Sequence, residues 1–443
     1  MITDMTEGAP SRILWKFTIP MLVSVMFQQF YNIADSVVAG KFIGVNALAA
    51  VGASYSVTMI FMSVATGLNI GCSVVISLYF GAKEYKQMKS AISTSLLVVF
   101  GISIFLTVLG LVFSKPLMLL LKTPKDILGD SLLFLNIYIC GLAFLFLYNI
   151  CTGIFTALGD SRTPLYFLIA SSIGNIILNL VFVIKFHMGV SGVAWATFLA
   201  QGISSVLVCV ALRKRLKSIE SGEYKRFSLS MLNRIMRVAV PSILQQSFVS
   251  VGNLFVQGVI NSYGSAVVAG YSAAMKINTF AIMSFSTLGN GVSSFTAQNM
   301  GARKAERVAK GFRSGATMVL GVAIPAFLLF FFAARPLVNL FMSEGGTQAA
   351  DVGVQFLKIV SPFYIVIALK LIADGILRGA GAMKVFMIAT FTDLILRVIL
   401  AFVLSGFWKE TGIWMSWPIG WLMGTILSMV FYFSGIWKKQ HVI

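Results

Sequence analysis

Long apolar runs without a single charge constrain this chain more than any other feature. Residues 96–113 read LLVVFGISIFLTVLGLVF and hold no charged residue over 18 positions. This is close to the length that crosses the hydrocarbon core of a bilayer as a helix. A helix in a soluble protein is seldom apolar on every face for so long. Only 11% of all residues are charged and the mean hydropathy is +0.90, so we expect lipid to cover much of the protein.

Twelve apolar stretches lie between charged or turn-rich breaks, which predicts an all-α integral membrane protein with twelve transmembrane helices. Several of them exceed 25 residues, which implies tilted helices. The predicted limits are 13–39, 48–80, 89–113, 129–157, 164–187, 192–214, 231–261, 268–299, 307–333, 349–378, 384–405 and 413–437.

The basic residues are distributed unevenly over the two sides of these spans. If the N-terminus is cytoplasmic, 23 of the 34 Lys and Arg fall in cytoplasmic segments and seven in outer segments. The positive-inside rule therefore predicts a multi-pass protein of the plasma (cytoplasmic) membrane with both termini in the cytoplasm. The formal net charge of +19 sits in short loops without an interleaved aromatic platform, so it does not indicate a nucleic-acid partner.

The chain also repeats itself. Ile19-Pro20 matches Val240-Pro241, and the Gly81-Ala82-Lys83 stretch matches Gly301-Ala302-Arg303 at an offset of 220. The residues 153–159 match 375–381 at an offset of 222. We predict two six-helix lobes, 1–213 and 231–443, joined by a cytoplasmic linker at 214–230 and related by a pseudo-two-fold axis along the membrane normal.

Charge inside the membrane is costly and marks function by default. The first half has one acidic residue well inside a span, Asp35. Burial disfavours an ionised carboxylate, so we expect Asp35 to exchange a proton or to bind Na⁺. Gln28 lies two turns away on the same face, and Asn175, Asn179 and Thr197 fall at a similar depth. These residues predict a cation-responsive site. The alternative is a polar cluster that only packs helices together.

The second half carries mixed charges instead of a lone acid. Lys370, Asp374 and Arg378 are spaced at i, i+4 and i+8, and Asp393 and Arg397 at i, i+4. They form either structural ion pairs or a functional charge network. Allowing a short gap, Asp393 and Arg397 take the repeat positions of Asn175 and Asn179. Lys276 is a further base within a span, expected to contact an anionic group or one of these acids.

Sequence motifs for catalysis and for bound groups are missing. The chain has no phosphate-binding Walker loop and no nucleophile–base pattern, so we predict that it is not an enzyme and needs no cofactor. The four cysteines lie inside apolar spans without metal-ligand spacing, and we expect neither disulfides nor a metal centre other than Na⁺ at Asp35. They are Cys72, Cys140, Cys151 and Cys209.

Several of these motifs together resemble the MATE (multidrug and toxic compound extrusion) transporters, most closely their DinF-like branch. They are the spacing of Pro20, Gln28 and Asp35, the stretch 35–40, the Gly81-Ala82-Lys83 turn, the run 153–163 (GIFTALGDSRT) and the six-plus-six repeat. The resemblance implies twelve helices in two lobes around a central cleft. It also implies export of amphipathic or cationic organic compounds in exchange for H⁺ or Na⁺.

By the same resemblance, Asp35 forms the ion site of the first lobe together with Gln28, Asn149, Asn175, Asn179 and Thr197. Position 179 is acidic in some relatives and is Asn here, which favours protons over Na⁺. The resemblance also implies that Ile367 stands where the NorM-like branch has a second-lobe acid.

We therefore predict a monomeric secondary antiporter that works by alternating access of its lobes, with Pro20 as a hinge because proline breaks a helical hydrogen bond. Its partners are small organic substrates and membrane lipid. A lipid-linked precursor flippase of related architecture and, less in keeping with the pattern, a channel are the alternatives.

Overall fold

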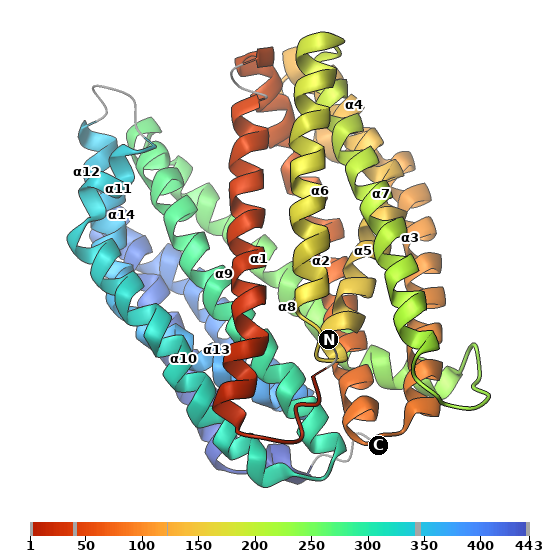
Figure 1. Ribbon diagram of the computed structural model, residues 1–443. Helices are drawn as coiled ribbons and strands as arrows, with labels where there is room; N and C mark the ends of the chain where they lie inside the picture. The colour runs from red at the N-terminus through yellow and green to blue at the C-terminus, as the bar shows by residue number, and fades with distance from the viewer. Residues whose placement is uncertain (1–2, 39–41, 122, 342–346, 440–443) are drawn as a thin grey trace. The chain divides into compact units, whose positions relative to one another are not determined.

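The chain folds into long helices. The computed structural model describes residues 3–38, 42–121, 123–341 and 347–439, and for residues 31–38, 45, 46 and 48 it describes the backbone alone. No strand occurs among the described residues. The helices of the first half are α1 (Pro10–Val38), α2 (Val45–Gly81), α3 (Tyr85–Leu120), α4 (Lys125–Cys140), α5 (Leu142–Ala157), α6 (Arg162–Leu180) with the π-helical turn η2 (Val181–Lys185), and α7 (Gly189–Lys217) (Figure 1).

The second half repeats this series. Its helices are α8 (Leu229–Asn261), α9 (Ser265–Gly301), α10 (Ala305–Phe332), α11 (Ala334–Asn339), α12 (Thr347–Val360), α13 (Tyr364–Gly379) and α14 (Met383–Phe433), with the short 3-10 turns η3 (Ser361–Phe363) and η4 (Ile436–Lys439).

The predicted twelve spans are found once the breaks are counted. Ten helices of the described part are long and apolar enough to cross a membrane, and α4 and α5 together form an eleventh span bent by 49°. The helix α14 contains non-helical backbone at Trp408 and Lys409, so its 51 residues make two spans. The sequence did not predict the break at Gly141 between α4 and α5.

The apolar surface explains why these helices need lipid. In α3, the most apolar window has a mean hydropathy of 2.8, yet only 17% of it is buried within the protein. Large side chains such as Phe105, Val108 and Val112 remain exposed along this helix. Because a helix satisfies its own backbone hydrogen bonds, it can present such a face to hydrocarbon at no polar cost.

By internal contacts the chain forms two compact units. The first comprises residues 1–4 and 23–246, and the second comprises residues 5–22 and 247–443. Both division points fall inside helices, between Leu22 and Val23 in α1 and between Gln246 and Ser247 in α8. Each of these helices therefore begins in one unit and ends in the other. The lobe limits 1–213 and 231–443 stay a prediction about the membrane architecture.

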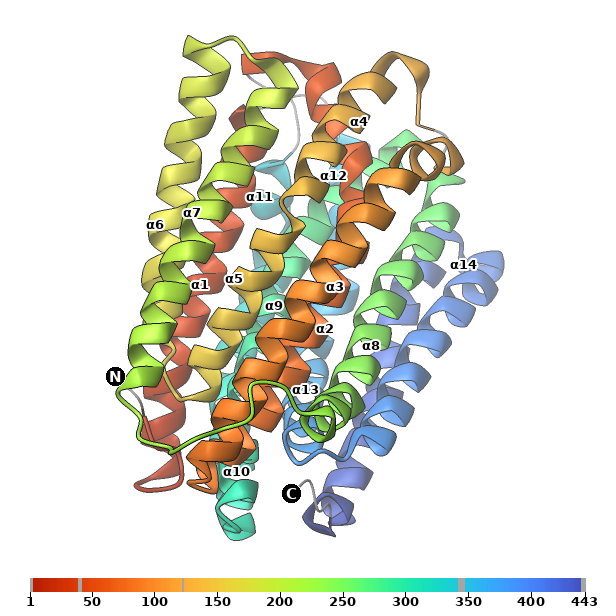
Figure 2. The ribbon, with the colours of Figure 1, turned by 90° about the vertical axis from the view of Figure 1, so that its right-hand side faces the viewer.

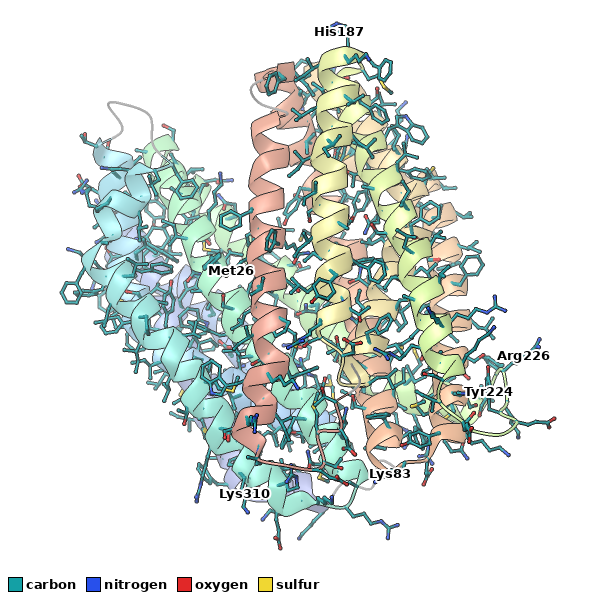
Figure 3. All side chains as sticks on the ribbon, viewed as in Figure 1. Met26, Lys83, His187, Tyr224, Arg226 and Lys310 are labelled. Atoms are coloured by element: carbon teal, nitrogen blue, oxygen red, sulfur yellow. The ribbon has the colours of Figure 1, made fainter. Side chains whose placement is uncertain are left out.

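In the first unit, α6 and α7 run side by side, and α5 packs against α2 and α7 (Figure 2). Polar ends mark this unit. Lys83 and Arg226 lie at one end, and His187 lies at the opposite end beyond α6 (Figure 3). The apolar helices between these ends account for the length of the unit.

In the second unit, small residues bring α9 and α13 into close contact. A Cβ atom on Gly375 would overlap the carbonyl of Gly289, and one on Gly379 would overlap the carbonyl of Ser293. Without a hydrophobic drive between helices in lipid, such close backbone packing is a main source of association.

The backbone carries the internal repeat as well. Non-glycine residues with positive φ are uncommon, yet Lys83 (φ 60°) is matched by Arg303 (φ 57°) at an offset of 220. His187 and Lys409 both have φ 51°, at an offset of 222. The two halves thus share their turns residue by residue.

Candidate functional site

A buried polar cluster joins α6 and α7 in the first unit. The amide Nδ2 of Asn179 donates to Asn175 Oδ1 at 2.7 Å, and Asn175 Nδ2 donates to Thr197 Oγ1 at 3.3 Å. Thr197 Oγ1 in turn donates to the carbonyl of Val193 at 3.1 Å. Asn175 and Asn179 are almost fully buried. The structure therefore brings together three of the residues predicted for the ion site.

The other three predicted residues of this site lie on α1 and α5. Asp35 lies on α1 in the part of that helix that belongs to the first unit, but its side chain is outside the described part of the structure. Gln28 is partly exposed on the same helix. Asn149 donates to the carbonyl of Leu145, one turn back on its own helix α5, at 2.8 Å. The membership of these three in the site stays a prediction.

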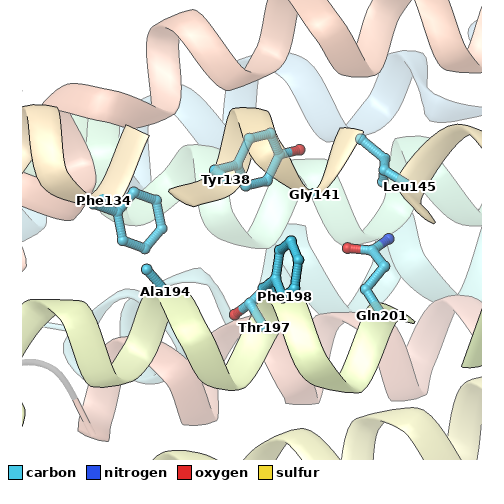
Figure 4. Close-up of a pocket in the computed structure, with 8 residues that line it drawn as sticks. All are labelled: Phe134, Tyr138, Gly141, Leu145, Ala194, Thr197, Phe198 and Gln201. Carbon is cyan, nitrogen blue, oxygen red and sulfur yellow. The ribbon is translucent and has the colours of Figure 1, made fainter. Parts of the chain in front are cut away.

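A small recess opens beside the cluster, where α4 ends and α5 begins (Figure 4). It is lined on one side by Phe134, Tyr138 and Gly141 and on the other by Thr197 and Gln201. Thr197, Gln201 and Tyr138 are the lining residues with polar side-chain groups, and the others are apolar. Thr197 therefore belongs both to the polar cluster and to the lining of this recess.

The second unit holds a buried charge network on α13 and α14. Lys370 Nζ lies 2.8 Å from Asp374 Oδ2 and 3.6 Å from Asp393 Oδ2. Ser428 Oγ donates to the other oxygen of Asp374 at 2.5 Å. All these residues are at most 5% exposed. The predicted pairing of Lys370 with Asp374 is present, and Lys370 also bridges to the second acid.

Arg397 and Lys276 lie apart from this bridge. The guanidinium of Arg397 stacks over the ring of Trp417, with its carbon 4.4 Å from the ring centre. Lys276 is exposed and lies over the ring of Phe341 at 5.5 Å. Among the described residues it forms no ion pair with Asp374 or Asp393, so the expected contact between Lys276 and these acids is not formed in this structure.

Arg378 occupies the last turn of α13, where it donates to Asn290 Oδ1 at 2.5 Å and lies over the ring of Phe386. A cation there is also favoured by the negative end of the helix. These contacts assign Arg378 to helix packing between α9, α13 and α14.

The run 153–163 forms a structural turn. Gly159 has φ 76°, a conformation that favours glycine, and Asp160 caps α6 by accepting from the backbone N–H and the hydroxyl of Thr163. Burial raises the pKa of Asp160, but these bonds and the one from Arg215 outweigh it and hold the pKa below its ordinary value. Gly381 repeats the turn with φ 77°.

Comparison with known proteins decides the family. The family model described as MatE matches the chain twice, at residues 20–181 and 241–403. The chain belongs to the MatE family. The two matches are offset by 221 residues at their starts and 222 at their ends, in agreement with the repeat found in the sequence. The DinF-like branch stays a prediction.

Several relatives of this MatE protein cover it almost completely. It is 29% identical to the "Probable multidrug resistance protein YpnP" of Bacillus subtilis, over 99% of this chain and 98% of the relative. It is 26% identical to the "Probable multidrug resistance protein YoeA" of the same organism, over 96% and 94% of the two chains.

A solved structure described as an outward-facing conformation of a multidrug resistance MATE family transporter has the same fold. Its TM-score is 0.92 at 21% identity, over 99% of both chains. The protein therefore has the twelve-helix, two-lobed fold of these transporters. It is a multi-span membrane transporter and not an enzyme.

Sequence reasoning missed several partners in the second unit. Ser428 on Asp374, Asn290 on Arg378 and Trp417 under Arg397 all lie far along the chain from the residues that they contact. Periodicity places residues on one face of one helix, and it contains no information about which distant helix packs there. The repeat itself was the one signal that could have pointed to Trp417.

Proposed function

We propose that this protein is a secondary antiporter that exports amphipathic or cationic organic compounds in exchange for H⁺ or Na⁺. The observation that carries the proposal is the hydrogen-bonded cluster of Asn175, Asn179 and Thr197. It is buried in the same unit as the stretch of α1 that bears Asp35. Relatives named as probable multidrug resistance proteins support the substrate class.

The chemistry of the cluster suits a small cation. Amide and hydroxyl oxygens stabilise a positive charge, and a nearby carboxylate supplies the charge that must be neutralised when the ion or proton binds. We propose that the Asp35 carboxylate faces α6 and α7 and that binding alters its interactions with them. The energy of the ion gradient would then be transmitted to α1.

The helix α1 is suited to receive such a signal because it passes from the second unit to the first just after Pro20. Proline removes one helical hydrogen bond and weakens the helix at that point. We propose that α1 bends there, that the lobes alternate their access with both termini in the cytoplasm, and that the protein acts as a monomer in the plasma membrane.

The test is transport by the Asp35→Asn variant in membrane vesicles. The amide keeps the size of the side chain and removes its charge, so we expect gradient-driven transport to be lost while expression and folding are kept. Asp126→Asn, a change of the exposed acid in the first turn of α4, is the matched control and should transport normally. Retained ion-coupled transport by Asp35→Asn would refute the proposal.

A further inference from the structure

The repeat identifies which residue of the second unit occupies the place of Asn175. Two turns bracket this part of the chain, Gly159 with Gly381 and His187 with Lys409, and both pairs have the same φ within 1° at an offset of 222. The burial pattern of residues 172–179 also recurs at 394–401. Arg397 is therefore the equivalent of Asn175. The expectation that Asp393 takes this place is wrong, because the offset puts Asp393 opposite Ser171.

The facing helix gives the second correspondence. Gly192 matches Gly412 at an offset of 220, and the pattern of buried and exposed residues at 411–416 repeats that of 191–196 residue by residue. Trp417 is therefore the equivalent of Thr197. The contact between Arg397 and Trp417 within α14 therefore occupies, in the second unit, the position that the α6–α7 cluster occupies in the first.

The contacts at these equivalent places differ in one respect. In the first unit, Asn175 and Thr197 share a hydrogen bond between neutral groups. In the second, a guanidinium lies over the face of Trp417 at 4.4 Å, an arrangement in which the ring stabilises the cation. We propose that Arg397 is a tethered cation, fixed at the position of the second unit where the first unit binds its exchangeable ion.

Within the described part of the chain, Arg397 is held in place without a close ion pair, although Asp393 lies one turn back on the same helix. Among the described residues it forms no ion pair, and its Nε has no acceptor although the side chain is only 5% exposed. Its terminal nitrogen lies 3.5 Å from Asn253 Oδ1 on α8. The titratable groups that act on it are Asp393 on its own helix and Tyr271 on α9. Asp393 Oδ2 lies 3.6 Å from Lys370 Nζ, and Asp393 Oδ1 has no hydrogen-bond partner among the described residues.

The crossing helix of the second unit supports the same view. The matches that start at residues 20 and 241 place Val256 on α8 opposite Asp35 on α1. Val256 is fully buried and cannot bind a cation. A guanidinium neither dissociates from the chain nor loses its proton in a protein. The second unit would therefore stay in its ion-loaded state throughout the cycle, and coupling would be confined to the first unit.

This inference rests on the proposed ion site of the first unit, so its test uses an Asp35→Asn background, which removes that site. Thermal unfolding of the purified protein is measured with added Na⁺, with methylguanidinium and at lowered pH, and with choline chloride at equal ionic strength as the reference. The rebuilt variant, Arg397→Asn with Trp417→Thr, places the residue types of Asn175 and Thr197 at their two equivalent positions in the second unit. We expect its unfolding temperature to rise saturably with at least one of these cations, because a vacant cation site is stabilised by its ligand.

Arg378→Asn in the same background is the matched control, since it also removes a buried arginine of the second unit but at a helix end. It should show no saturable response. Equal responses from both variants, or none from either, would overturn the inference. If the rebuilt variant does not fold, Arg397→Met with Asp393→Asn removes both charges together. We expect this pair to fold and to lose transport when Asp35 is intact, and normal transport would contradict a tethered cation.

The proposed function is judged separately, by ion coupling in protein that has Asp35 and Arg397 unchanged. If Asp35→Asn loses coupling while the rebuilt variant shows no cation response, the two results together support the ion site of the first unit and reject only the role of Arg397.

Discussion

Each amide of the first-unit cluster is fixed by its neighbour. Asn175 accepts from Asn179 and donates to Thr197, so the orientation of all three side chains is set by one chain of hydrogen bonds. In a buried, low-dielectric site, such a chain loses more from one missing member than the average single bond is worth. The hydroxyl of Thr197 links these amides of α6 to α7, where it donates to the carbonyl of Val193.

Replacing Thr197 by Val removes the hydroxyl and keeps the shape of the side chain. Asn175 Nδ2 would lose its acceptor, which costs about 1–3 kcal/mol for a buried group. We expect this bond to orient Asn175 mainly in the ion-bound state, and a difference of about 1.4 kcal/mol between the two states raises the ion concentration needed for half-maximal transport about tenfold.

Transport is measured in vesicles as the concentration of the driving ion is varied. Thr197→Ser keeps the hydroxyl and serves as the control. If Val and Ser behave alike, the hydroxyl has no part in ion binding.

The sequence predicts much at this scale but not the partners. The spacing of Asn175 and Asn179 is enough to place both on one face of a helix, and their polar type within an apolar span signals a site. The stacking of Arg397 on Trp417 could not be read in this way, because contact between two separate spans depends on how those helices pack. The same holds for Lys276: the sequence predicts the span in which it lies but not its contact with Phe341.

At the scale of the helix, close contacts at glycine decide how the elements pack. A Cβ atom on Gly153 of α5 would overlap Asn69 Oδ1 of α2 within the first unit. On Gly101 of α3 it would meet nothing within 4 Å. Comparing alanine substitutions at these two glycines therefore distinguishes the effect of packing on stability from the effect of helix propensity.

We expect Gly153→Ala to destabilise the protein by about 1–3 kcal/mol, because overpacking forces neighbours to shift. Gly101→Ala should be neutral or stabilising by up to about 1 kcal/mol, since alanine favours the helix. Thermal unfolding in detergent measures both. A Gly153→Ala variant as stable as Gly101→Ala would show that the side chain of Asn69 moves aside at little cost.

The crossing helices are the second feature at this scale. The prolines of α1 and α8 lie shortly before the points where these helices pass from one unit to the other, at Leu22 and Gln246. Pro20 and Pro241 were visible in the sequence as a repeated pair. The passage of each helix between units was not, because it is a property of contacts made over the whole chain.

Pro20→Ala should straighten and strengthen α1, since an interior proline costs a helix about 3 kcal/mol. We expect transport to fall by about tenfold or more with folding stability unchanged or improved. Pro116→Ala, in the last turns of α3, is the control and should transport normally. Vesicle transport at matched expression measures both variants, and full activity of Pro20→Ala would exclude a hinge at this position.

For the whole molecule, duplication explains why two similar units differ in charge. The same family model matches both halves, and their turns coincide residue by residue. A duplicated chain starts with two copies of every site, and changes in one copy then separate the roles of the units. The first unit holds the amide cluster and the Asp35 segment, whereas the second has a buried network in which Lys370 bridges two acids. We expect the first unit alone to sense the driving ion.

The most direct test of this account is substrate transport into everted membrane vesicles under an imposed ion gradient. Pairs of vesicles carry a pH gradient or a sodium gradient with the membrane potential clamped, and a fluorescent organic cation reports transport. We predict accumulation driven by one of the two gradients, abolished by an ionophore that dissipates it and absent in Asp35→Asn. Equal accumulation with and without both gradients, or full accumulation in Asp35→Asn, would contradict ion coupling through the first unit.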